Sequence, residues 1–270
     1  MVKPPADTDF GPAVCAYAVA ELEAAIDGLA QRGARLHAGV HRARKGMRRT
    51  RAVLALLPAD AGVRLLDRGV RRVNRSLSPL RDAHALVETV ERLAALHRAP
   101  ASLAWPRVRR AAAAYRRGCK QAVLDADPGM AGARAQLEVL RAALGGVRWR
   151  LDGDALEAAL GRTAARAAAA GARAVDSSDD ADWHRWRRRL RRLSQQRRAA
   201  AAAGAADELS AYERSVAEQL GLAQDLVLLR ARCGEDAPFR PDDRIALRRL
   251  ATRLLARQRR RIAAVLAETR

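Results

Sequence analysis

A short basic pattern, His-x-x-Arg-(Lys/Arg)-x-x-Arg-Arg, occurs twice in this chain, over 41–49 and over 184–192, at an offset of 143 residues. The same offset relates Asp82 to Asp225. Further pairs keep it: Leu66, Val73 and Leu77 correspond to Leu209, Val216 and Leu220, and Arg116-Arg117 corresponds to Arg259-Arg260. Because charged and apolar positions repeat together, the sequence predicts two copies of one structural unit.

The periodicity of the chain is helical throughout, and no segment shows sustained strand alternation. Ala, Leu and Arg, which favour helices, dominate the sequence. Proline and glycine breaks then predict helices over 13–32, 36–57, 61–77, 78–97, 106–126, a segment ending at 144, 155–175, 183–203, 206–220, 222–232 and from 241 onward. We therefore expect an all-α fold of two pseudo-symmetric helical bundles that flank a basic cavity or tunnel.

The predicted domain organisation follows from the same breaks. Residues 1–12 contain three prolines and are expected to form a flexible N-terminal tail. A glycine-rich segment around 145–153 separates the halves 13–145 and 154–268 of a single domain over 13–268.

The chain is strongly basic, with 51 Lys and Arg against 30 Asp and Glu and a formal net charge of +21. Nearly all the basic residues are arginines, whose planar donor fork matches phosphate oxygens, although a GC-rich codon bias also replaces Lys by Arg. No acidic residue occurs over 28–59 or over 183–206, and each window contains eight Lys or Arg. This segregation favours a basic surface and a polyanionic partner.

Two neighbouring stripes run along each basic helix. In the first copy, the apolar stripe over 36–57 should face the core and the adjacent stripe carries imidazole and guanidinium groups. The candidate phosphate-binding residues of the first copy are His37, His41, Arg44, Lys45, Arg48, Arg49 and Arg51. Those of the second copy are His184, Arg187, Arg188, Arg191 and Arg192, with Arg116, Arg117, Arg259 and Arg260 as further candidates. Solvated faces of ordinary surface helices remain the competing interpretation.

Other site types find less support in the sequence. His37 and His41 have the i, i+4 spacing of a metal-binding pair, but the surrounding positive charge would repel a divalent cation. Asp82 and Asp225 are interpreted as structural acceptors for arginines or helix ends. There is no glycine-rich phosphate loop, nucleophile elbow or Cys/His arrangement, so we expect neither a catalytic site nor a cofactor.

The chain also lacks an apolar run long enough to cross a membrane and an apolar segment typical of a signal peptide. Its three cysteines, Cys15, Cys119 and Cys233, fit neither a disulfide framework nor a zinc site. These features favour a reducing, cytoplasmic setting and no membrane association.

At these residues the sequence resembles the conserved histidine α-helical domain (CHAD) family. The matching segments are the first basic helix over 40–51, Leu-Ser-Pro-Leu-Arg-Asp over 77–82, Leu-Gly-Arg-Thr over 160–163, the second basic helix over 183–193 and Leu-Gly-Leu-Ala-Gln-Asp-Leu over 220–226. Gln224 stands where the family often has His, and Ala164-Ala165 stands where Tyr and a basic residue are common. The resemblance implies two helical bundles around a basic cavity, binding of inorganic polyphosphate and association with polyphosphate granules.

We therefore expect non-enzymatic binding of inorganic polyphosphate through the candidate residues above. The alternative is a nucleic-acid-binding helical protein, although the chain lacks a helix-turn-helix signature and has few aromatic residues for base stacking. A phosphate-transfer or phosphate-hydrolysing enzyme is the third class. Weak nucleic-acid binding through charge alone is compatible with the first. The oligomeric state is left open.

Overall fold

The computed structural model describes residues 8–97, 103–205, 210–234 and 237–267 of the chain. These residues form ten α-helices and two short 3-10 helices, and none of them lies in a strand, which confirms the all-α prediction. The α-helices are α1 (Gly11–Ala30), α2 (Leu36–Leu54), α3 (Ala61–Ser76), α4 (Ser78–Leu96), α5 (Trp105–Ala126), α6 (Ala131–Leu144), α7 (Gly153–Val175), α8 (Asp180–Ala202), α9 (Ala211–Ala231) and α10 (Pro241–Ala267). The 3-10 helices are η1 (Gly33–Arg35) and η2 (Pro128–Met130).

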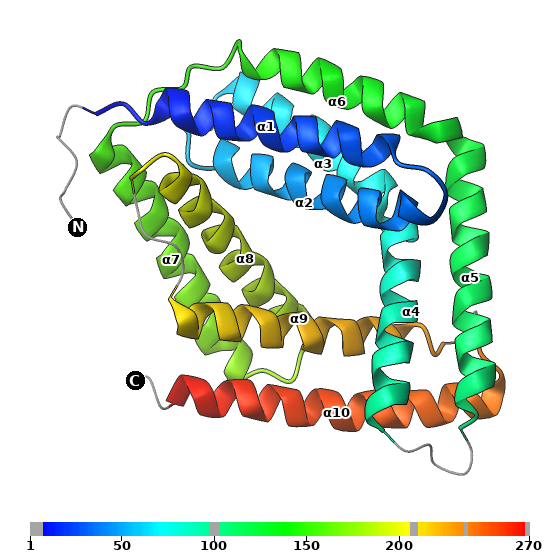
Figure 1. The fold of residues 1–270 in the computed structure, drawn as a ribbon. Coiled ribbons are helices and arrows are strands. Elements are labelled where there is room, and N and C mark those ends of the chain that lie inside the picture. Colours follow the sequence, from blue (N-terminus) through cyan, green and yellow to red (C-terminus); the bar gives the residue numbers. More distant parts are fainter. Residues whose placement is uncertain (1–7, 98–102, 206–209, 235–236, 268–270) are drawn as a thin grey trace.

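The helices run along four sides of a frame (Figure 1). α1, α2, α3 and α6 form one side, α4 and α5 the second, α9 and α10 the third, and α7 and α8 the fourth. α2 packs along α1 and also contacts both α4 and α8. The basic helix of the first sequence copy therefore lies against the basic helix of the second.

The apolar side chains form three cores. The first joins α1, α2, α3 and α6 and includes Ala199 and Ala200 of α8. The second joins α4 and α5 to α9 and α10, and the third joins α7, α8 and the start of α9 to Ile262 of α10. Apolar packing is thus shared between the predicted halves instead of dividing between 145 and 154. The internal repeat itself stays a prediction.

The first basic helix, α2, is fixed against α1 by a close backbone approach. A Cβ atom at Gly39 would collide with the carbonyl oxygen of Gly28, and one at Gly46 would collide with that of Glu21. The predicted apolar stripe of α2 is buried, including Val40 and Met47. The neighbouring polar stripe of α2 is therefore held so that it faces α4 and α8.

The second basic helix, α8, is held in place by its buried apolar stripe and by a hydrogen bond to α2. Trp183, Trp186 and Leu190 are buried in the third core. Gln196, also buried, donates from Nε2 to the backbone oxygen of Ala52 at 3.0 Å and so connects α8 directly to α2. These contacts fix the positions of the two basic faces relative to each other.

One predicted break between helices is wrong. The helices predicted over 206–220 and 222–232 are one continuous helix where described, α9, which begins at a capping box formed by Ser210 and Glu213. A single internal glycine, Gly221, costs a helix only about 1 kcal/mol, and the buried residues on either side of it outweigh that cost. The end of the predicted domain at 268, and Leu209 of the proposed repeat, lie outside the described residues.

Residues 9–12, which were predicted to belong to a flexible N-terminal tail, have defined positions in the structure, and α1 begins at Gly11. Residues 1–7 lie outside the described part of the chain. Phe10 is buried in the first core and its amide donates to the oxygen of Leu151 at 2.9 Å, while Asp9 Oδ1 accepts from the amides of Gly11 and Leu151, each at 2.9 Å. Residues 9–11 therefore attach the start of α1 to the segment before α7.

Among the described residues, no helix combines the length and the apolar composition that crossing a membrane requires. Cys15, Cys119 and Cys233 are all free thiols.

Candidate anion-binding site

Five arginines from three helices meet where α2 lies between α4 and α8. We call them the central arginine cluster: Arg44 and Arg48 of α2, Arg81 of α4, and Arg187 and Arg191 of α8. All five are half-buried. Four of them belong to the polar stripes that the sequence predicted, and the packing of α2 on α8 brings those stripes together as expected for one shared site.

The cluster carries a concentrated positive charge that is partly removed from water. Burial, followed by the neighbouring guanidinium groups of Arg191, Arg44, Arg81 and Arg187, lowers the pKa of Arg48 to about 9. Burial and Arg191 likewise lower the pKa of Arg187 to about 9, although Asp225 opposes the effect. Both side chains still carry their charge at neutral pH, so the fold holds like charges together at an energetic cost.

Several donors of the cluster have no acceptor among the described residues. The buried Nε atoms of Arg44, Arg48 and Arg187 make no hydrogen bond there. Arg44 Nη1 donates to the backbone oxygen of Asn74 and to Ser78 Oγ, the latter at 3.0 Å. Buried guanidinium donors without acceptors are costly in a protein unless an anion accepts from them.

Two carboxylates border the cluster. Asp82 and Asp225 line one small pocket between α4 and α9. Asp82 lies 3.7 Å from Arg81, and Asp225 Oδ2 accepts from Arg92 Nη2 at 3.3 Å. The two aspartates are therefore paired with arginines, as their predicted structural role requires, and they lie together although 143 residues separate them.

Three arginines predicted to bind phosphate have carboxylate partners on other helices. Arg51 forms two hydrogen bonds to Asp67 of α3, at 2.7 and 3.0 Å. Arg49 pairs with Glu21 of α1. Arg259 pairs with Asp180 at 2.6 Å and lies over the ring of Trp183. These contacts attach the basic helices to their neighbours, so we do not place these three residues among the leading ligands.

The remaining candidates of the second copy are not part of the central arginine cluster. His184 Nδ1 lies 2.6 Å from Gln224 Oε1, so Nδ1 carries the proton and donates to the amide oxygen. Arg188 and Arg192 are exposed on α8, and Arg260 is exposed on α10. In the first copy, Lys45 is exposed and lines a groove on the outer face of α1 and α2.

A basic pocket of about 730 Å³, separate from the central arginine cluster, lies between α2, α4 and α5. We call it the histidine pocket. The ionisable side chains that line it are His37, His41, His84, Glu88, Arg116, Arg117 and Lys120. The predicted residues His37, His41, Arg116 and Arg117 are thus brought together, but in a pocket of their own.

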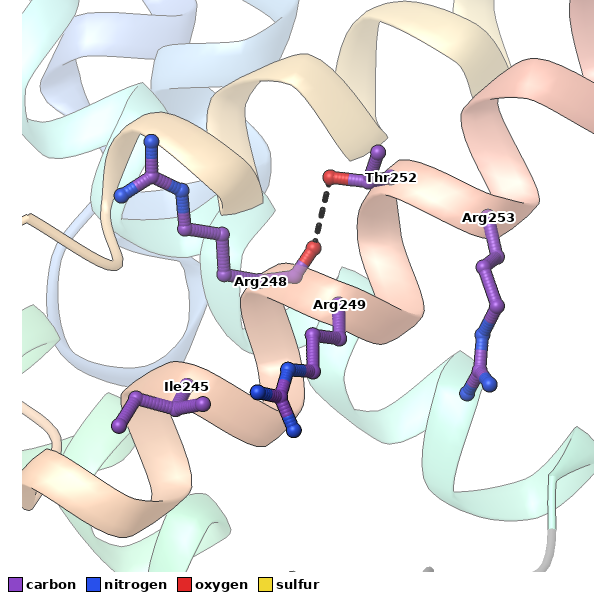
Figure 2. Close-up of a pocket in the computed structure, with 5 residues that line it drawn as sticks. All are labelled: Ile245, Arg248, Arg249, Thr252 and Arg253. Carbon is purple, nitrogen blue, oxygen red and sulfur yellow. Dashed lines mark hydrogen bonds between the residues drawn. The ribbon is translucent and has the colours of Figure 1, made fainter.

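An open groove runs along α10 on the opposite side of the frame from α1 and α2 (Figure 1). Figure 2 shows its lining residues, Ile245, Arg248, Arg249, Thr252 and Arg253, all on one helix. The hydroxyl of Thr252 donates to the backbone oxygen of Arg248 at 2.8 Å. All three arginines are exposed and lie on α10, a helix that contributes no residue to the central arginine cluster.

Arg81 and Lys120 are not among the residues that the sequence predicted to bind phosphate. Arg81 precedes Asp82 in the Leu-Arg-Asp segment. His84 follows Arg81 by three residues, which is about one helical turn. That spacing could have pointed to one polar face of α4. Lys120 follows Arg116 by four residues on α5 and had the same signal. Across the described residues, no group of three or more His, Cys, Asp or Glu side chains could hold a metal ion.

Comparison with known families and structures gives a consistent result. The model of the CHAD domain family matches residues 13–234. The crystal structure of the CHAD domain from the plant Ricinus communis is 20% identical, with a TM-score of 0.64, covering 98% of this chain and 92% of that chain. PptA from Streptomyces chartreusis is 20% identical, with a TM-score of 0.63, covering 96% of each chain. No curated protein matches the sequence.

Proposed function

Because this chain belongs to the CHAD domain family, which is associated with polyphosphate binding and metabolism, we propose that it binds inorganic polyphosphate at the central arginine cluster without transforming it. The observation that carries the proposal is the set of half-buried arginines on three helices, among which Arg44, Arg48 and Arg187 have buried Nε donors that lack acceptors. A chain of phosphates supplies closely spaced oxygen acceptors and one negative charge per unit, and Arg–phosphate hydrogen bonds are among the stronger polar contacts in proteins.

The geometry of the cluster favours a slender polyanion over a nucleic acid. Its ligating groups are guanidinium groups, which contact phosphates without distinguishing bases. Trp183 and Trp186, the aromatic residues of α8, are buried in the third core and are not available for base stacking. We therefore propose that duplex DNA binds more weakly than polyphosphate at equal phosphate concentration.

The proposal of binding without catalysis rests on the two carboxylates at the site. Asp82 and Asp225 are the acidic groups beside the cluster, and each has an arginine partner. Metal-assisted phosphate chemistry needs carboxylates that are free to ligate a cation. In the cell, such binding would direct the protein to polyphosphate granules.

The decisive experiment is a competition assay with fluorescent long-chain polyphosphate against unlabelled polyphosphate, duplex DNA and RNA, at physiological salt. Polyphosphate should compete best, and its affinity should fall steeply as salt rises because binding releases counterions. Equal or stronger competition by DNA would favour the nucleic-acid alternative. Sustained phosphate release that depends on Asp82 or Asp225 would overturn the binding-only proposal.

Paired variants locate the site. Each charge-assisted contact contributes about 1.5–3 kcal/mol, so Arg48→Ala with Arg191→Ala should weaken polyphosphate binding at least about tenfold. Arg68→Ala with Arg71→Ala, on the exposed face of α3, is the charge-matched control. Arg249→Ala with Arg253→Ala tests the groove on α10. A loss in either control pair as large as that of the cluster pair would mean that binding is diffuse electrostatic attraction.

A further inference from the structure

The histidine pocket contains two stacked imidazoles from different helices. The rings of His37 on α2 and His84 on α4 are parallel within 6°, with centroids 4.6 Å apart. Both side chains are half-buried, and both line the pocket of about 730 Å³. The Nδ1 atom of His84 is buried and has no hydrogen-bond partner among the described residues.

Positive charge faces this pair from each side of the pocket. α5 contributes Arg116, Arg117 and Lys120, and α4 contributes Arg81 one turn before His84. α2 contributes His41, which has Lys45 and Arg48 near it. The acidic side chain of the described lining is Glu88, whose Oε1 lies 3.4 Å from His84 Nε2.

This environment holds the imidazoles in their neutral form. Burial, then His84, Arg116 and Lys120, lowers the pKa of His37 to about 4. Burial is also the main cause that lowers the pKa of His84, with Arg116 and Arg81 acting in the same direction against Glu88. Two parallel rings at 4.6 Å cannot both become cationic without an anion nearby to offset their repulsion.

We propose that the histidine pocket is a phosphate-binding site distinct from the central arginine cluster, and that a phosphate group binds there together with a proton taken up by the His37–His84 pair. The inference rests on the proposed function, since polyphosphate is the ligand. A phosphate between the imidazoles and the α5 cations adds negative charge beside the pair. That charge favours the imidazolium form, which donates from both ring nitrogens.

The coupling gives polyphosphate affinity a pH dependence of defined sign. The bound phosphate raises the histidine pKa, so the complex holds more protons than the protein and polyphosphate apart, and affinity rises as pH falls. An opposite charge raises such a pKa by about 1–3 units, which for His37 gives an increase of up to about twentyfold in affinity between about pH 7.5 and 5.5. Arg48 and Arg187 of the central arginine cluster, each with a pKa of about 9, keep their charge in this range.

The test is isothermal titration calorimetry of the full chain with long-chain polyphosphate near pH 6.5, in buffers of different ionisation enthalpy. Long chains are used because their internal phosphates are strong acids and exchange no protons in this range. The slope of the observed enthalpy against the buffer enthalpy should correspond to net uptake of a fraction of a proton, up to about 0.8, for each occupied pocket. It should vanish in His37→Gln with His84→Gln, while binding at pH 7.5 through the arginines persists.

His97→Gln, on the residue that follows α4 and outside the pocket, is the matched control and should keep the proton uptake. Binding by the wild-type protein with no buffer dependence, or proton uptake that the double variant retains, would overturn the inference and leave the proposed function intact. If polyphosphate does not bind at any pH, the proposed function itself fails. Thermal melting of the double variant checks that it is folded.

Discussion

The central arginine cluster should make the protein less stable than its cores would allow, and Arg48→Met tests this directly. The pKa of Arg48 lies at about 9, well below its usual value. At about 1.4 kcal/mol for each unit of pKa, the charged side chain costs the folded state at most roughly 5 kcal/mol at neutral pH. Local relaxation and bound counterions reduce this cost, so we expect the variant to be more stable by about 1–3 kcal/mol.

The measurement is urea unfolding at low ionic strength, because guanidinium salts would screen the charges. The effect has a predicted sign with pH. The unfolded state binds the Arg48 proton more tightly, so the cost is fully present below about pH 9 and fades as pH rises above it. The stability difference between variant and wild type should therefore shrink by about 1 kcal/mol between about pH 8 and 10.

Arg68→Met, an exposed position on α3, is the control and should change stability by no more than about 0.5 kcal/mol. The reasoning is refuted if Arg48→Met is no more stable than the wild type in low salt. It is also refuted if the control gains as much. Polyphosphate should raise the melting temperature of the wild type more than that of the variant, because the variant lacks the charge that the ligand neutralises.

Three further predictions concern single positions. Asp225→Asn removes a counter-charge from Arg187, so stability should fall by about 1 kcal/mol while polyphosphate binds more tightly at low salt. Gly221→Ala, where an added Cβ meets no atom, should stabilise the protein by about 0.5–1 kcal/mol. Gly39→Ala should destabilise the protein by more than about 1 kcal/mol. Urea unfolding curves of the two variants measure both effects. Asp243 is 1% exposed and accepts hydrogen bonds from Arg107 at 2.6 and 2.8 Å. Asp243→Asn should lower the free energy of unfolding by about 1–3 kcal/mol. Because the pKa of Asp243 is lowered in the folded protein, the stability difference between wild type and variant should be present above the usual Asp pKa. It should be lost as the pH falls through the lowered value.

The helices could be predicted from the sequence because their causes are local. Apolar spacing and proline or glycine breaks placed most helix ends within three residues of the structure. The error at Gly221 arose where a local break signal met tertiary packing, since buried side chains on both sides keep α9 continuous. How the helices combine into cores was not predictable in the same way, because α4 and α5 pack on α9 and α10 through contacts distant in sequence.

The same distinction applies to the candidate site. Spacing along one helix identified the polar faces that carry Arg48 and Arg191, and the structure brings these residues together. It did not distinguish Arg48 from Arg51, three residues along the same stripe, because the partner of Arg51 is Asp67 on another helix. Spacing along one helix therefore does not show that Arg51 has a carboxylate partner on another helix, whereas Arg48 keeps a buried Nε without an acceptor among the described residues.

The distribution of burial explains how the fold can hold such a cluster. The three apolar cores lie at the contacts between helix layers, and the stripe of α2 beside Arg48 is occupied by Met47 in the first core. Apolar burial next to the cluster stabilises the same helices whose charges repel one another. A ligand that accepts from these arginines removes the repulsion without altering the cores, so part of the binding free energy is stored in the folded protein beforehand. Charge that is preorganised but not neutralised favours tight binding of a polyanion in general, because side chains that are already packed lose little conformational entropy when a ligand binds.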